Sequence, residues 1–220
     1  MQERSISDLK QYSAELRAGA LELIERSGIR KVVAATLGQL EVVGSVDLDL
    51  MVWRDIDLYA RAGPEESSRF VGLLTEICAG LSRAGHLMVK ASFNNEYRRP
   101  GNPYGHGLYL GLLVLLNGEV PEWKIDLWAW NEATYPQKMA EHARLAEALK
   151  QADRDLILRI KQAVHSRREY RNTITSLDVY AFALAGAGTT VDDFDEFVRN
   201  RQVAAAISLA NRGSGSRSVL

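Results

Sequence analysis

The feature that most constrains this chain is a pair of acidic residues inside an apolar stretch. Asp55 and Asp57 alternate with Ile56 and Leu58 within the segment 42–59. Successive side chains of a β-strand point to opposite faces, so both carboxylates are expected on one face and both apolar side chains on the other. Carboxylates this close repel each other and lose hydration unless a cation neutralises them. The pattern therefore predicts a well-covered strand that carries a cation-binding pair.

Two further elements belong with this pair. Gly44-Ser45 follows a strand expected over 40–43, and a short helical segment is expected over 46–51. A Gly-Ser turn at such a position can bring backbone N–H groups close to a phosphate. Asp126 lies in a later apolar strand over 123–130, between Ile125 and Leu127. Asp126 is therefore the candidate for a third carboxylate of the same site.

A competing register exists for the acidic pair. Asp47-Leu48-Asp49 also alternates, and it directly follows Gly44-Ser45. It is disfavoured because no room would remain for a helix that aims its N–H groups at a phosphate. Asp55 and Asp57 are the preferred pair, with Asp47 and Asp49 held as the alternative.

The remaining periodicities predict a mixed α/β first half and a helical second half. A strand is expected over 87–93 and a polar loop over 94–106, while the segment 29–39 is ambiguous between strand and short helix. Asn117-Gly118 predicts a tight hairpin turn between strands over 108–116 and 123–130. Three- and four-residue apolar spacing predicts helices over 7–25, 64–81, 137–149, 153–165, 176–185 and 191–209.

These residues resemble the motif of the polymerase-β-like nucleotidyltransferase superfamily: Gly-Ser, then Asp-x-Asp on the next strand, then a carboxylate on a later strand. In character the chain is most similar to its small bacterial members, which include antibiotic nucleotidyltransferases. The resemblance covers roughly residues 38–130. It implies an α/β (α+β) nucleotidyltransferase fold, with a mixed, mostly antiparallel twisted sheet, helices packed on one side of it, and additional C-terminal helices.

The resemblance also implies a chemistry. It makes Asp55, Asp57 and Asp126 the catalytic residues and the ligands of two Mg²⁺ ions, with Asp126 on the ion that activates the acceptor. Transfer of a nucleotidyl group depends on positioning and on electrostatic stabilisation, which carboxylate-bound Mg²⁺ supplies. The expected reaction moves a nucleoside monophosphate from an NTP, with ATP the expected nucleotide, to a hydroxyl of a small-molecule acceptor, and it releases pyrophosphate. Transfer to protein or RNA is an alternative, as is a non-catalytic nucleotide- or partner-binding module of the toxin-antitoxin type.

Further binding residues follow from charge and shape. The triphosphate is expected at Gly44 and Ser45, with its charge neutralised by basic residues. Candidates for that role are Arg54, Lys90 and Lys124, followed by Arg98 and Arg99. Three aromatic residues are candidates for stacking on a nucleobase: Tyr109, Trp123 and Trp128. Aromatic side chains in strands nevertheless belong more often to the core. His106 is more simply a structural residue than a general base.

Composition limits the partners and the compartment. Lys and Arg together number 27 and Asp and Glu 28, a net charge of -1, so neither nucleic acid nor a membrane surface is an expected partner. Cys78 is the single cysteine, which excludes an intramolecular disulfide. The polar N-terminus lacks the apolar core of a secretion signal, and a cytoplasmic location is expected. The expected organisation is a catalytic domain over 1–135, a helical region over 136–212 and a flexible tail over 213–220.

Overall fold

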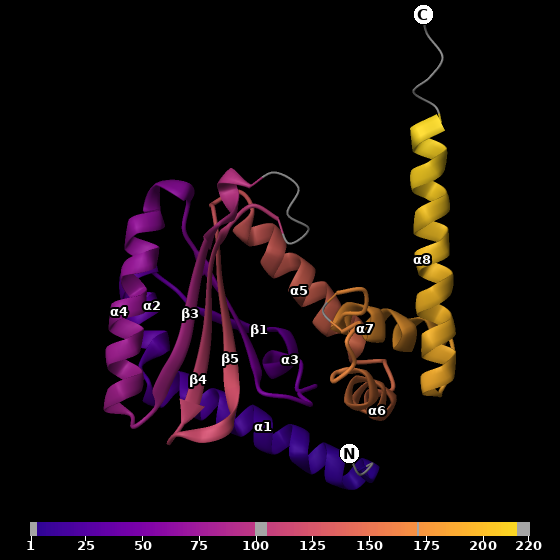
Figure 1. The fold of residues 1–220 in the computed structure, drawn as a ribbon, viewed down its shortest axis with the longest axis horizontal. Helices are drawn as coiled ribbons and strands as arrows, with labels where there is room; N and C mark the ends of the chain where they lie inside the picture. Colours follow the sequence, from indigo (N-terminus) through magenta and orange to yellow (C-terminus); the bar gives the residue numbers. More distant parts are fainter. Residues whose placement is uncertain (1–3, 100–104, 171, 215–220) are drawn as a thin grey trace, which may run out of the picture. The chain divides into compact units, whose positions relative to one another are not determined.

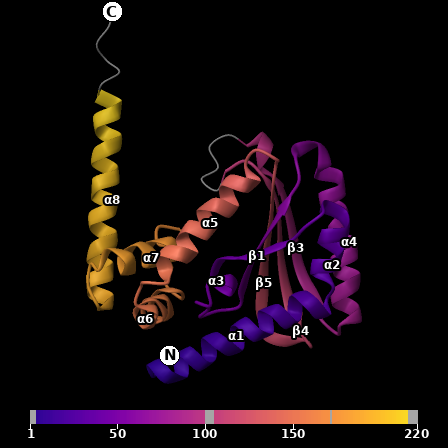
Figure 2. The same ribbon diagram turned by 180° about the vertical axis from the view of Figure 1, so that it is seen from behind.

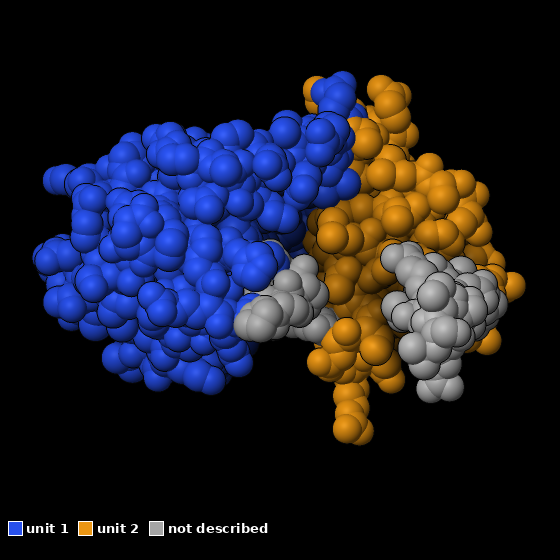
Figure 3. Space-filling view, turned by 90° about the horizontal axis from the view of Figure 1, so that it is seen from above, with its two compact units in different colours: residues 1–147 blue, residues 148–220 orange. Residues whose placement is uncertain are grey.

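The chain divides into two compact units. A computed structural model describes residues 4–99, 105–170 and 172–214. One unit spans 1–147 and the other 148–220, so that the division falls near the end of helix α5 (Tyr135–Leu149) (Figure 3). The acidic residues singled out from the sequence all belong to the first unit.

The first unit is built on one mixed sheet. In the described part of the chain, five strands pair in the order β1-β2-β5-β4-β3, and β2 and β5 form the one parallel pair. The expected mixed, mostly antiparallel sheet is therefore confirmed. Asn117 and Gly118 both have positive φ, at 51° and 78°, and make the expected turn between β4 and β5. The strands are β1 (Glu41–Val43), β2 (Asp55–Arg61), β3 (Leu87–Asn95), β4 (Leu108–Leu116) and β5 (Glu119–Trp130).

The helices of this unit follow the apolar periodicity of the sequence. The ambiguous segment forms helix α2 (Ile29–Leu37), because Ile29, Val33 and Leu37 recur every four residues and all three are buried. Ser5 caps the first helix by accepting a hydrogen bond from the Asp8 amide at 3.2 Å. The other helical elements are α1 (Ile6–Arg26), α3 (Gly44–Asp47), η1 (Pro64–Glu66), α4 (Ser67–Arg83) and η2 (Glu96–Arg98).

The hydrophobic core lies between one face of the sheet and the helices α1, α2 and α4. Ile56 and Leu58 of β2 and Ile125 and Leu127 of β5 are at most 1% exposed and pack in this core. Figures 1 and 2 show α2 and α4 on this side of the strands and α5 on the other. The core fixes which face of each strand is buried, so the alternate residues of β2 and β5 must point away from it.

The described part of the second unit includes α6 (Arg154–Val164), α7 (Ser176–Ala185) and α8 (Val191–Ser214). Phe182 and Phe194 meet edge to face at 5.5 Å in its interior, and Lys161 is buried with its ammonium donating to the Tyr180 hydroxyl at 3.2 Å. The helical second half is thus confirmed. Of the expected tail, Gly213 and Ser214 belong to α8, and 215–220 lie outside the described residues.

None of the helices in the described ranges is both long enough and apolar enough to cross a lipid bilayer.

Two glycines of α4 give a matched test of this packing. A Cβ on Gly80 would lie 2.0 Å from the Ser27 carbonyl oxygen, whereas a Cβ on the exposed Gly72 would meet nothing within 4 Å. We expect Gly80→Ala to lower the free energy of unfolding by about 1–3 kcal/mol through overpacking. Gly72→Ala should raise it by about 0.5–1 kcal/mol, since alanine is the better helix former. Urea denaturation measures both, and equal effects would contradict this packing.

Candidate active site

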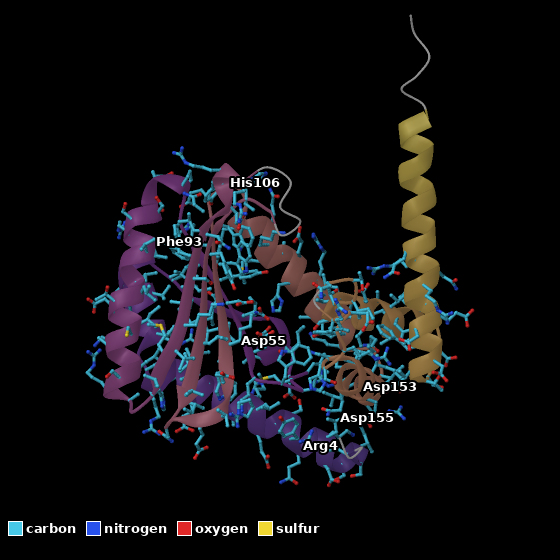
Figure 4. The ribbon with its side chains drawn as sticks, viewed as in Figure 1. Arg4, Asp55, Phe93, His106, Asp153 and Asp155 are labelled. Atoms are coloured by element: carbon cyan, nitrogen blue, oxygen red, sulfur yellow. The ribbon has the colours of Figure 1, made fainter. Side chains whose placement is uncertain are left out.

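The three aspartates share the face of the sheet that points away from the core. Asp57 is the register partner of Asp126 across the parallel β2–β5 pair, and Asp55 is two residues before Asp57. All three are half-buried, and the side chains of Asp55 and Asp126 are 13% and 15% exposed. Figure 4 shows Asp55 on the side of the strands opposite α4. The sheet therefore gathers three carboxylates from two strands that lie far apart in the sequence.

Gly44 brings the end of β1 against this cluster. Its φ of +63° favours glycine, and a Cβ there would lie 2.3 Å from Oδ2 of Asp57. Ser45 follows as a buried residue of α3, and its carbonyl accepts the Leu50 amide at 2.9 Å. The Gly-Ser turn and the Asp-x-Asp strand are thus in contact through Gly44 and Asp57, as their order in the sequence suggests.

Lys124 sits among the carboxylates. It is the register partner of Asp55, and its Nζ donates to Asp55 Oδ1 at 3.2 Å and also to Asp126 Oδ2. Its side chain is 28% exposed. The lysine therefore shares a face with Asp126, as expected for residues two apart in a regular strand, and its ammonium bridges two of the three acids.

The other basic candidates, Arg54 and Lys90, are placed differently from Lys124. Arg54 donates to the Pro121 carbonyl, and its guanidinium carbon lies 5.8 Å from the centre of the Trp123 ring, which belongs to the core. Lys90 of β3 is exposed and pairs in register with Leu113, which pairs in turn with Lys124. Lys90 thus stands on the site face but two strands from Lys124, roughly 10 Å away at normal strand spacing.

Tyr109 supports Asp126, a contact that the sequence analysis missed. Its hydroxyl donates to Asp126 Oδ1 at 2.9 Å. Burial, followed by the neighbouring Asp126, raises the pKa of Tyr109, which keeps the phenol protonated as a donor. Gly111, the register partner of Asp126, leaves the space for this hydroxyl, because a Cβ there would lie 2.3 Å from it. The sequence signal for this contact was a tyrosine followed two residues later by a glycine, Tyr109 and Gly111, on the same face of one strand.

An aromatic row continues along the same face beyond the acids. Tyr109 packs on Trp128 at 4.8 Å between ring centres, and Trp128 stacks on Trp130 at 5.0 Å with an interplanar angle of 3°. Tyr59 meets Trp130 edge to face at 5.9 Å. Of the aromatic residues considered for stacking, Tyr109 and Trp128 lie beside the carboxylates, whereas Trp123 is 3% exposed in the opposite face.

The alternative acidic pair lacks strand geometry. Asp47 ends α3, and Asp49 follows it with a φ of 55°, outside the extended region. Asp47 Oδ2 lies 2.7 Å from His142 Nε2 of α5, and Asp49 Oδ1 lies 3.9 Å from Arg17 Nε of α1. The two acids contact different helices, so Asp55 and Asp57 remain the pair that shares one strand face.

The loop candidates make local contacts. His106 is exposed, and its Nδ1 lies 3.2 Å from the Glu96 carbonyl oxygen. Arg99 pairs with the Glu96 carboxylate at 3.4 Å, and Arg98 ends the short helix η2. Residues 100–104 of the expected polar loop lie outside the described residues.

The donor chemistry of the three aspartates fits Mg²⁺, which prefers carboxylate oxygens and a partly hydrated shell. Within the described ranges, no group of three or more acidic, histidine or cysteine side chains is already spaced around a common metal position. Instead, the Lys124 ammonium lies between Asp55 and Asp126. A metal at these residues would therefore replace the contacts of an ammonium that is already there.

Comparisons with known proteins give little guidance. No protein-family model matches the chain, and no curated protein matches it. Among solved structures, a chain described as "structure of GLD-2/RNP-8 complex" superposes with a TM-score of 0.47 at 14% identity. The match covers 82% of this chain and 64% of that chain, which is less than two thirds of its length. At this level of similarity, conclusions about function rest on the site itself.

The environment of the Tyr59 hydroxyl leads us to expect a loss of stability at high pH. Burial, and then the nearby Asp57, raises the pKa of Tyr59 to about 12. Because the unfolded chain loses the Tyr59 proton near pH 10 and the folded protein only near pH 12, the contribution of Tyr59 to stability is fully present below pH 10. This contribution is lost as the pH rises toward 12. We expect Tyr59 to account for about 1 kcal/mol of the fall in unfolding free energy between pH 9 and pH 11. Chemical denaturation at both pH values should show a smaller fall for Tyr59→Phe, and an unchanged fall would contradict the assignment.

Proposed function

We propose that this protein is a Mg²⁺-dependent nucleotidyltransferase that moves a nucleoside monophosphate from an NTP to an acceptor hydroxyl. The observation that carries the proposal is the shared face of Asp55, Asp57 and Asp126, with Gly44 packed against Asp57. Three half-buried carboxylates on adjacent strands are costly for stability alone, because like charges repel and are poorly hydrated there. A reaction that needs bound cations explains why the sequence would keep them together.

The proposed reaction is an in-line displacement at phosphorus. The acceptor oxygen attacks the α-phosphorus, the bond from that phosphorus to the bridging oxygen breaks, and pyrophosphate leaves. Two bound Mg²⁺ ions would offset the charge of the phosphate oxygens and lower the pKa of the acceptor hydroxyl. Asp55, Asp57 and Asp126 would hold these ions through their carboxylate oxygens.

The chain itself would position the reacting groups. Asp126 would take the proton of the acceptor hydroxyl, while the Tyr109 hydroxyl fixes the orientation of its carboxylate at 2.9 Å. Gly44 and Ser45 would lie beside the β- and γ-phosphates, because Gly44 already approaches Asp57 closely. Lys90 stands on the same face and would offset triphosphate charge.

We propose a small hydroxylated molecule as the acceptor and ATP as the nucleotide. The near-neutral net charge of -1 favours a small acceptor over a polyanion such as RNA. Tyr109 and Trp128 are half-buried and lie on the face that carries the carboxylates, and such rings suit the flat, apolar surfaces of a small ligand or a nucleobase. Transfer to RNA or protein is the alternative outcome of the acceptor test.

Substitution of the acids tests the catalytic assignment. Incubation with α-labelled ATP, Mg²⁺ and a pool of acceptors should give labelled product, and Asp57→Asn should lower the rate at least about a hundredfold. Asp126→Asn should do the same. Asp49→Asn is the matched control: this exposed acid belongs to the alternative register, and asparagine tolerates its positive φ of 55°. Loss of activity in Asp49→Asn with retention in Asp57→Asn would reverse the assignment.

Separate acceptor pools test the acceptor class. We expect label on hydroxylated small molecules such as aminoglycosides or lincosamides, and none on tRNA or protein offered at equal concentration, because nothing in the net charge attracts a polyanion. Mass spectrometry of the product should show the added nucleoside monophosphate. Label that appears on tRNA or protein alone would overturn the small-molecule proposal while leaving nucleotidyl transfer intact.

A further inference from the structure

The Lys124 ammonium lies between two of the acids to which the proposed function assigns metal binding. It donates to Asp55 Oδ1 at 3.2 Å and to Asp126 Oδ2, and it therefore joins an acid of β2 to an acid of β5. Tyr109 holds the other oxygen of Asp126 at 2.9 Å. Both oxygens of Asp126 thus have donors, and the carboxylate is held in place from two sides.

The ammonium offsets part of a local charge excess. Three carboxylates carry three formal negative charges and Lys124 carries one positive charge, which leaves a local excess of two negative charges. In a half-buried site this lysine reduces the repulsion between Asp55 and Asp126, and its removal leaves acids without that partner. The same contacts oppose metal binding, since an incoming cation must compete for the same oxygens.

We infer that Lys124 is the resident counter-ion of the site: it keeps Asp55 and Asp126 in their binding positions before a metal arrives, and it is exchanged for the metal. The inference rests on the proposed function, and it assigns Lys124 a positioning role in place of a permanent triphosphate contact. Exchange, unlike simple addition, makes the site weak for free Mg²⁺. Exchange favours a cation that arrives bound to the triphosphate, because the displaced Lys124 ammonium can then pair with the negative charge of the phosphates.

The surroundings of Lys124 allow this exchange. Its side chain is 28% exposed and stands on the face of β5 that points away from the core, while the neighbours Trp123 and Ile125 point into the core. Its register partner on the other side is the half-buried Leu113, and the next residue in that row is the exposed Lys90. A change of side-chain rotamer therefore moves the ammonium without disturbing the core.

The test measures metal binding directly. The full-length protein is titrated with Mn²⁺ without nucleotide, and free Mn²⁺ is followed by electron paramagnetic resonance. Lys124→Met keeps the stem and removes the charge, and we expect a Kd about tenfold lower than in the wild type. Lys90→Met removes one charge from the same face two strands away and should stay within about twofold. Lys124→Arg retains the cation and should bind Mn²⁺ no more tightly than the wild type.

Thermal unfolding in EDTA and in Mn²⁺ is the second readout. Lys124→Met should unfold at a lower temperature than the wild type in EDTA, and Mn²⁺ should raise its Tm more than that of the wild type. If Lys124→Met folds only in the presence of Mn²⁺, as seen by circular dichroism, the result also supports the role. A loss of stability that Mn²⁺ does not restore would mean that Lys124 is purely structural, and it would overturn the inference.

The outcomes separate this inference from the proposed function. If the wild type binds Mn²⁺ and transfers nucleotide, but Lys124→Met binds Mn²⁺ equally well or more weakly, the counter-ion role fails and the proposed function stands. If neither protein binds Mn²⁺, with or without ATP, and no label is transferred, both fail. If Lys124→Met and Lys90→Met both bound Mn²⁺ about tenfold more tightly, the effect would come from the net charge of the face and not from Lys124 itself. That result would also overturn the specific role.

Discussion

The structure depends on holding like charges together on one face of a sheet whose other face is the core. Asp55 and Asp57 cannot turn inward, because Ile56 and Leu58, which alternate with them, are buried. Nor can Asp126, which stands between Ile125 and Leu127. The hydrophobic effect therefore fixes the direction of the carboxylates, at an electrostatic cost that the surrounding residues must offset. Lys124 and Tyr109 provide that offset in the described structure, and the proposed metal ions would take it over during the reaction.

Close approach is the second requirement of the site. Gly44 contacts it from the start of α3 and Gly111 from β4, and in each case a methyl group would collide with a functional atom: Asp57 Oδ2 in one, the Tyr109 hydroxyl in the other. The two glycines thus allow the close contacts of the site, whereas the core sets the direction of the acids. One lets the Gly-Ser turn reach Asp57, and the other lets a phenol reach Asp126. A site built from ordinary strand residues would be too wide for either contact.

The sequence was most informative where its pattern was periodic. Alternation around Asp55 and around Asp126 correctly indicated strands with one buried face, and Asn117-Gly118 correctly indicated a hairpin. Helix α2 stayed ambiguous because nine residues give too few repeats to separate the two periods. The pairing of Lys124 with Asp55 could not be predicted, since it depends on strand order and register, which arise from long-range packing. Nor could the contact of Tyr109 with Asp126, which depends on the space left by Gly111 in a neighbouring strand.

The parallel pairing of β2 with β5 also affects how the protein acquires its site. These strands lie side by side in the middle of the sheet, yet β3, β4 and helix α4 separate them along the chain. During synthesis β2 emerges long before its neighbour, and its apolar face has no β5 beside it until the hairpin is complete. Contacts this distant in sequence slow folding, because a long loop must close before they form. β5 is the last of the described strands along the chain, and it carries Asp126 and Lys124, so the site cannot be complete before β5 pairs with β2.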